Sequence, residues 1–227
     1  MLSRPELTRQ FDLISNEALQ APITIIGAGA IGSSVALWLA KLGCMDITVH
    51  DPGFVDIENV SCQLYGPHAL GKPKVEALSE IVGMLSVTKL KAVHSVWKPD
   101  PLKTSGIVIM AADCMEVRRQ TFETITSNHF RVRWFIDARM GAESALMYCV
   151  NPFSIEDKAT YHKTLYSNND AVQVPCTAKS TGYTASMLSA WVVKCVKDLL
   201  TGNDYPRVSL WNIRESALTN FKKEVLK

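Results

Sequence analysis

The sequence lacks the features of several specialised protein classes. No apolar run in its 227 residues is long enough to cross a bilayer, and the segment after Met1 is charged, unlike a secretory signal. A net charge of +2 gives no electrostatic footprint for nucleic acid, whose binding would call for a clustered basic face. These absences predict a cytoplasmic protein that binds neither membranes nor nucleic acid.

Cysteine is sparse and widely spaced. The six cysteines form no C-x-x-C pair, and the five histidines have no spacing typical of metal ligands. Thiols in the cytoplasm are normally reduced. We therefore expect neither disulfides nor a structural zinc site. The cysteines are residues 44, 62, 114, 149, 176 and 195.

The composition that remains is balanced, with 47% hydrophobic and 20% charged residues. A chain of this length buries one good core, so we expect a single domain over residues 1–227. Its expected parts are an N-terminal helical segment (1–20, with a helix over 7–14), a nucleotide-binding core (21–140) and a C-terminal part of the same domain (141–227).

A glycine-rich turn lies at the centre of the expected core. An apolar run from Ile23 leads into three glycines with G-x-G-x-x-G spacing, and helical periodicity follows. In such a turn Gly27 permits the reversal, Gly29 lets a phosphate approach the backbone, and Gly32 lets the helix pack on the strand. The N-terminus of the helix that follows offers free N–H groups to an anion.

A second feature of a nucleotide-binding unit follows about 20 residues later. Asp51 ends a short second strand, where an acid of this kind binds a ribose. Residues 52–73 then form a long connection at the carboxyl ends of the strands, where open α/β sheets bind ligands. The apolar strand over 106–111 brings Asp113 to the same edge. We interpret this edge as the functional one.

Periodicity predicts the rest of the fold. Strands are expected at 47–51, 88–93, 106–111, 132–137, 144–150 and 208–213, and helices at 35–42, 74–82, 115–128 and 181–200. The adjacent strands at 132–137 and 144–150 break the strand-helix alternation, and residues 154–175 read as irregular. The predicted class is α/β: a Rossmann-like nucleotide-binding fold with a parallel first half and an antiparallel extension.

An ordered set of residues resembles the ThiF/MoeB-like family and the ubiquitin-activating enzymes, which adenylate the C-terminus of a ubiquitin-like protein. The resemblance covers almost the whole chain and is more specific than the glycines alone. It is carried by Thr8-Arg9-Gln10, the glycine turn, Asp51, Asn59 with Gln63, Gly71-Lys72-Pro73-Lys74 and Ala112-Asp113.

The resemblance implies ATP and Mg²⁺ as cofactors, a ubiquitin-like or sulfur-carrier protein with a C-terminal glycine as partner, and a homodimer. It implies that Asp51 holds the ribose, Asn59 and Lys74 contact phosphates, Asp113 handles magnesium, and Arg9 reaches across the dimer. The other residues implied in nucleotide binding are Gly27, Gly29, Ala30, Gly32 and Gln63.

Elementary chemistry agrees with these roles. Attack of a carboxylate on the α-phosphorus of ATP brings two anions together, so the site needs cations and a metal-binding carboxylate. Lys74, Arg9 and Asp113 supply both. Each residue alone also has a structural alternative: an exposed lysine at a helix start, a surface arginine, and an aspartate that caps a helix.

Two positions depart from the family pattern. Cys62 stands where the family usually has the arginine of an Asn-x-x-Arg-Gln run, and Gly53 replaces a second acid. Loss of a bidentate phosphate donor lowers a rate steeply unless another cation replaces it. Arg139 and Lys72 are the substitutes that the sequence offers. Without a substitute the chain would be a non-catalytic relative.

Cys176 is the candidate nucleophile. Its Pro-Cys-Thr segment resembles the catalytic-cysteine segment of ubiquitin-activating enzymes. A nearby helix N-terminus and Lys179 would stabilise its thiolate, whereas the alternative is a small buried residue. Cys62 is the rival thiol.

Three functions follow from the sequence. The first is an ATP-dependent adenylyltransferase that acts on a ubiquitin-like or sulfur-carrier protein, with thioester formation as a further step. The second is a binding or scaffold subunit that keeps the fold without the chemistry. The third, an NAD-dependent oxidoreductase, is disfavoured because no Tyr-x-x-x-Lys or similar proton-transfer group follows the glycine turn.

Overall fold

The structure is a computed structural model that describes residues 4–10, 12–127, 130–166 and 180–221. In these residues an eight-stranded sheet has the order β3-β2-β1-β4-β5-β6-β7-β8. The parallel half consists of β1 (Ile23–Ile26), β2 (Ile47–His50), β3 (Lys91–Val93), β4 (Ser105–Met110) and β5 (Arg131–Gly141). The antiparallel half adds β6 (Ser144–Val150), β7 (Val208–Asn212) and β8 (Ala217–Phe221). The predicted fold class, including the change of strand direction, is confirmed.

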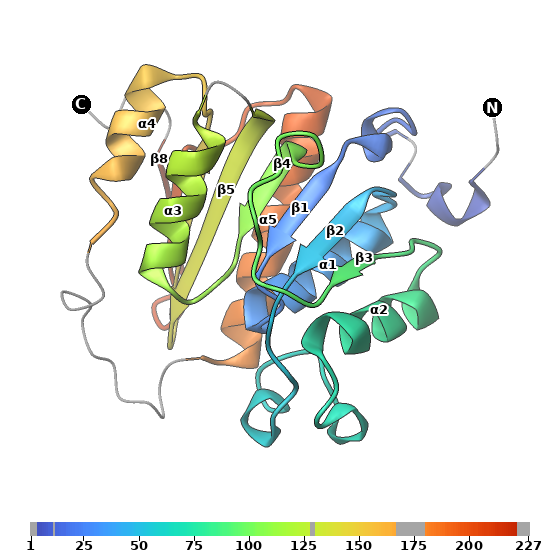
Figure 1. Cartoon of the computed structure of the whole chain (residues 1–227). Coiled ribbons are helices and arrows are strands. Elements are labelled where there is room, and N and C mark those ends of the chain that lie inside the picture. Colours follow the sequence, from blue (N-terminus) through green and yellow to red (C-terminus); the bar gives the residue numbers. More distant parts are fainter. Residues whose placement is uncertain (1–3, 11, 128–129, 167–179, 222–227) are drawn as a thin grey trace.

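Helices cover both faces of the sheet, as Figure 1 shows. On one face α1 and α5 pack against each other, with α2 beside α1; on the other lie α3 and α4. A buried apolar cluster fills the space between each helical layer and the sheet. The helices are α1 (Ala30–Leu42), α2 (Lys74–Leu85), α3 (Met115–Ile125), α4 (Ile155–His162) and α5 (Gly182–Thr201).

Local sequence signals explain the clearest elements. All four residues of β1 are buried, as expected for an apolar strand with helices on both faces. Helix α5 begins where the Thr181 side chain accepts a hydrogen bond from the Thr184 N–H, and it ends at Gly202 in the left-handed conformation. None of the helices in the described ranges is both long and apolar enough to cross a membrane.

Three expectations about elements were wrong. The helix expected over 7–14 does not form in the described residues of that range (7–10 and 12–14), where turns follow a 3₁₀ helix (Pro5–Leu7), because a single short helix is marginal without tertiary packing. The region expected to be irregular contains α4, whose first turn is capped by the Ser154 side chain. Strand β8 was missed because it is an exposed edge strand without an alternating apolar pattern.

Candidate active site

Two glycines of the glycine turn have no room for a side chain, and the third has open space around it. Gly27 has a φ of +101°, and a Cβ there would lie 2.8 Å from the carbonyl carbon of Ala111. A Cβ on Gly32 would lie 1.9 Å from the Gly27 oxygen. A Cβ on Gly29 would meet nothing within 4 Å. Gly29 therefore leaves open space in front of the turn, where a phosphate needs it.

Helix α1 directs unpaired amides into this space. The first intrahelical bond at its start runs from the Ser33 N–H to the Gly29 oxygen, at 3.0 Å. The N–H groups at the first three helical positions, including that of Ala30, therefore have no partner within the helix. Together with the helix dipole they form a site for an anion.

Asp51 joins the ends of β1 and β2. Its two carboxylate oxygens accept hydrogen bonds of 2.7 Å from the N–H groups of Ala28 and Gly53. The carboxylate therefore fixes the glycine turn. The buried Tyr65 hydroxyl supports the same turn by donating to the Ala28 oxygen at 2.6 Å, and burial raises the pKa of Tyr65, which keeps this donor protonated. Sequence reasoning missed this role of Tyr65, and its only signal was the presence of an aromatic residue in the loop.

The connection over residues 52–73 is ordered by its own polar side chains. It contains two 3₁₀ helices, Ile57–Asn59 and Pro67–Ala69. Asp56 and Asn59 cap the first of them reciprocally, with the Asp56 N–H donating to the Asn59 side-chain oxygen at 3.1 Å. The side-chain oxygen of Gln63 is buried and has no hydrogen-bond partner among the described residues. A donor on an ordered water or on a ligand would satisfy this acceptor.

Lys74 and Asp113 face this edge from neighbouring parts of the fold. Lys74 starts α2, and its Cδ and Cε lie 3.7 Å from a Cβ built on Gly53, so its stem runs beside Gly53. Asp113 follows β4, which is held next to the turn by a 2.8 Å bond from the Ala111 N–H to the Ile26 oxygen. No ion pair or hydrogen bond joins the side chain of Lys74 or Asp113 to another described residue.

The alternative reading of Asp113 as a helix cap is wrong, because α3 has Cys114 at its N-cap position and no side-chain cap. No group of three His, Cys, Asp or Glu side chains in the described part of the chain could hold a metal by itself. Mg²⁺ usually needs only one or two carboxylates, because substrate phosphates and water fill its other positions. The exposed carboxylate of Asp113 fits that requirement.

Neither expected substitute for the missing arginine is a free cation. Arg139 lies 2.7 Å from the buried Asp137 carboxylate and also donates to the Thr164 backbone oxygen at 2.9 Å. Lys72 pairs with Glu80 at 2.8 Å. Arg139 is engaged within the fold and Lys72 in a surface ion pair, so the structure does not support the expected compensation.

The buried Asp137 was not foreseen as part of this edge. It accepts hydrogen bonds from Arg118, Arg139 and the Tyr161 hydroxyl, the last at 2.8 Å. Arg118 also donates to the backbone oxygen of Ala112, next to Asp113. This cluster therefore positions the loop that carries Asp113. Sequence reasoning missed it because its members come from three separate elements.

Cys62 is half-buried in the connection that borders the site. The start of α5 packs against it: a Cβ on Gly182 would lie 3.4 Å from the Ser61 oxygen and 3.8 Å from the Cα of Cys62. Cys176 and Lys179 lie outside the described residues. In the sequence, Cys176 lies six residues before Gly182, the residue of α5 that packs near Cys62.

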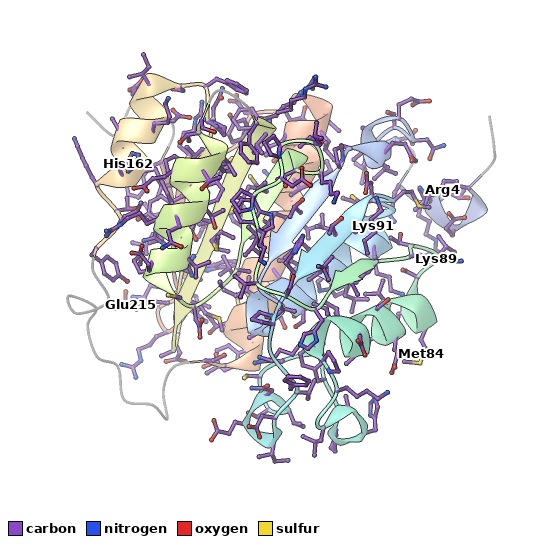
Figure 2. All side chains as sticks on the ribbon, in the orientation of Figure 1. Arg4, Met84, Lys89, Lys91, His162 and Glu215 are labelled. Atoms are coloured by element: carbon purple, nitrogen blue, oxygen red, sulfur yellow. The ribbon has the colours of Figure 1, made fainter. Side chains whose placement is uncertain are left out.

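Arg9 is not brought to this edge within one chain. It is exposed, and the neighbouring Gln10 bonds to the Lys41 oxygen near the opposite end of α1, at 3.3 Å. Arg4 donates to the Gly43 oxygen at 2.8 Å, and Figure 2 shows Arg4 far from the loops of the nucleotide edge. The role of Arg9 across a dimer stays a prediction.

Comparison with known sequences supports the assignment of the fold. A family model described as "ThiF family" matches residues 9–225. Saccharomyces cerevisiae tRNA threonylcarbamoyladenosine dehydratase 1 is 31% identical over 107 residues, which cover 42% of this chain and 24% of that protein. Escherichia coli molybdopterin-synthase adenylyltransferase is 31% identical over 97 residues, 40% of this chain and 39% of that protein. The chain thus aligns with well under two thirds of either relative.

Crystal structures of two further proteins have the same fold. PaaA is 16% identical, with a TM-score of 0.76 over 97% of this chain and 74% of that one. Escherichia coli MccB, crystallised with AMPCPP and MccA, is 15% identical, with a TM-score of 0.73 over 99% of this chain and 74% of that one. At these identities the likeness concerns the fold alone.

Proposed function

Because the chain belongs to the ThiF family, we propose that it is an ATP-dependent adenylyltransferase for the C-terminal carboxylate of a ubiquitin-like or sulfur-carrier protein. The observation that carries this proposal is the combination of an open space at Gly29 with the uncommitted side chains of Lys74 and Asp113. An anion site bordered by a free cation and a free carboxylate is what phosphate chemistry needs.

Each of these residues has a distinct task in the proposal. The amides at the start of α1 bind phosphate oxygens, and Lys74 neutralises charge that develops as pyrophosphate leaves. Asp51 binds the ribose while holding the turn through Ala28. Asp113 would hold Mg²⁺, which when bound neutralises phosphate charge. Asn59 and Gln63 add polar contacts from the connection.

The relatives support a protein or peptide as the second substrate. One relative is a molybdopterin-synthase adenylyltransferase, and MccB was crystallised with MccA and the ATP analogue AMPCPP. The other relative is a tRNA threonylcarbamoyladenosine dehydratase, so the relatives do not share one named substrate. We propose a carrier with a free C-terminal glycine.

ATP–pyrophosphate exchange tests this function. The full chain would be assayed with Mg-ATP and ubiquitin, and with a matched ubiquitin whose C-terminus is an amide. We expect exchange with the free carboxylate and none with the amide, because only a carboxylate attacks the α-phosphorus. Mg-ATP should also raise the melting temperature, whereas NAD should not. An NAD shift without an ATP shift would favour the oxidoreductase.

One observation favours a second candidate, a binding or scaffold subunit without the chemistry. Cys62 replaces the expected arginine, and both Arg139 and Lys72 are held in ion pairs. A chain of this kind would show the Mg-ATP thermal shift and no exchange with any carrier that ends in Gly-Gly. The two readouts together therefore separate the two candidates.

A further inference from the structure

A cavity lies at the end of the sheet opposite the proposed nucleotide site. Its volume is about 530 Å³. It is bordered by residues 17–22, the first residues of β4 and β5, and the last turn of α5. In Figure 1 these segments meet at the top of the sheet, whereas the connection over residues 52–73 lies at the bottom. Cavities that bind small molecules measure roughly 300–1,000 Å³.

A β-bulge shapes this cavity. Val132 pairs with Gly106 and Trp134 pairs with Ile107, so Arg133 is an extra residue in β5. Gly106 has a φ of +71°, and a Cβ there would lie 2.3 Å from the Pro22 oxygen. Only glycine fits at this position, so the close approach of Pro22 requires a glycine beside the bulge.

The bulge brings two consecutive residues to one cavity. In a regular strand, consecutive residues point to opposite faces of the sheet. Arg133 and Trp134 are consecutive, yet both line the cavity, together with Arg131. Bulges commonly redirect a side chain in this way. The apolar part of the wall includes Pro22, Leu199 and Leu200.

The two arginines are uncommitted. No carboxylate lies within 4.0 Å of the guanidinium of Arg131 or Arg133 in the described part of the chain. In contrast, Arg118 and Arg139 both pair with Asp137. Glu17 is the one acidic residue among the described lining residues, so the wall carries an excess of positive charge.

We propose that this cavity binds a small organic anion. A carboxylate or phosphate group would meet Arg131 and Arg133, because a guanidinium presents paired donors that match either oxyanion. An apolar body would rest against Trp134 and the leucines of α5. Glu17 at the rim weakens the binding of any anion. The site is separate from the nucleotide edge, so the proposal goes beyond adenylation.

Fluorine NMR on the full chain tests the proposal with three probes of similar shape. These are 4-fluorophenyl phosphate, 4-fluorobenzoate and the neutral 4-fluorobenzamide. We expect the two anions to bind at least about 10-fold more tightly than the amide, as charge-assisted bonds require. ATP should not displace them.

Matched variants locate the site. Arg131→Ala and Arg133→Ala should each weaken anion binding about 10-fold, and Glu17→Gln should strengthen it. Arg214→Ala is the control: Arg214 has 81% of its side chain exposed and does not line the cavity, so binding should stay within about 2-fold. Because Arg131 and Arg133 are exposed, their variants should fold normally, which circular dichroism would verify.

Three results would overturn the proposal. One is equal binding of the amide and the anions, which would make the cavity merely apolar. Another is unchanged anion binding in both arginine variants. The third is displacement of the anions by ATP, which would place them at the nucleotide edge instead. None of these results bears on pyrophosphate exchange, so the proposed function is tested independently of this cavity.

Discussion

The carboxylate of Asp51 accepts a 2.7 Å hydrogen bond from the backbone N–H of Ala28, inside the glycine turn. The acid at the end of β2 therefore determines the shape of the loop at the end of β1. Its second oxygen accepts from the Gly53 N–H, also at 2.7 Å. A residue expected only to hold a ribose thus also organises the phosphate site.

Replacement of Asp51 should damage both stability and nucleotide binding. Asp51→Ala leaves two amides without partners, which should lower the free energy of unfolding by about 1–3 kcal/mol. It should also weaken ATP binding by at least about 10-fold. Urea unfolding and ATP titration measure the two effects. Asp46→Ala is the control, since Asp46 forms only a surface ion pair with Lys91 and should cost about 1 kcal/mol or less. Equal effects of the two changes would contradict the organising role.

The three glycines of the turn should separate folding from binding. Gly29→Ala meets no atom within 4 Å, so stability should change by less than about 1 kcal/mol while ATP binding is lost. Gly32→Ala places a Cβ 1.9 Å from the Gly27 oxygen and should destabilise the fold by about 1–3 kcal/mol or more. Thermal unfolding and ATP titration of both variants check this. Normal ATP affinity in a folded Gly29→Ala variant would exclude phosphate binding at this turn.

Much of the fold could be predicted because the strands and long helices have strong apolar patterns. The strand over Ser144–Val150 was predicted to the residue, and the change to antiparallel pairing followed from its closeness to β5. Helix α4 was missed because its polar composition hides a real signal, Ser154 three residues before Asp157. Local sequence contains the cap, but tertiary packing decides whether so short a helix forms.

The candidate site was predictable where its residues follow strand ends, and unpredictable where it depends on long-range pairing. The ends of β1, β2 and β4 share one edge, so the order of the strands brings Gly29, Asp51 and Asp113 together. Asp137 and Arg139 are two residues apart on β5, so their ion pair is local. Their bonds to Arg118 of α3, Tyr161 of α4 and Thr164 depend on how distant segments pack against β5, and no local pattern predicts them.

Lys74 and Asp113 should matter for chemistry and little for folding. Lys74→Ala and Asp113→Ala should each lower ATP–pyrophosphate exchange by about 100-fold or more, by comparison with other charge-stabilising groups. Neither side chain has a described partner, so the free energy of unfolding should change by less than about 0.5 kcal/mol. Lys89→Ala, at an exposed lysine, is the matched control. If Asp113→Ala keeps full exchange in magnesium, the metal role is wrong.

Restoring the missing arginine should raise activity. Because Arg139 and Lys72 are held in ion pairs, we expect slow exchange in the native chain and a gain of at least about 100-fold in Cys62→Arg, within the range of arginine-finger effects. Cys62→Ser controls for loss of the thiol and should leave exchange unchanged. Fast native exchange that Cys62→Arg leaves unchanged or lowers would show that another cation already compensates.

Arg139 should contribute to the stability of the fold. Arg139→Ala removes one of the two arginines that neutralise Asp137, whose side chain is fully buried. The free energy of unfolding should therefore fall by about 3 kcal/mol, the lower end for a broken buried ion pair, because Arg118 still pairs with the carboxylate. Urea unfolding measures it. A variant with native stability and abolished exchange would instead identify Arg139 as a phosphate contact.

Cys176 should accept the activated carboxylate as a thioester. An acyl-adenylate is a mixed anhydride with AMP as leaving group, so a thiolate displaces AMP without further phosphate chemistry. Cys176 precedes Gly182 by six residues, and an extended chain of that length reaches roughly 20 Å. Because Gly182 packs against Ser61 and Cys62, Cys176 is within chain reach of the connection that borders the proposed site.

Two thiol variants separate the possibilities. Cys176→Ala should keep pyrophosphate exchange and lose a conjugate with the carrier that reductant releases, whereas Cys62→Ala should keep both, because only Cys176 is assigned the acyl transfer. Electrophoresis without reductant, followed by thiol treatment, detects the conjugate. A thioester that persists in Cys176→Ala would move the role to another thiol. Full exchange without any thioester in the native chain would instead mean that the acyl-adenylate is the final product and that Cys176 takes no part in acyl transfer.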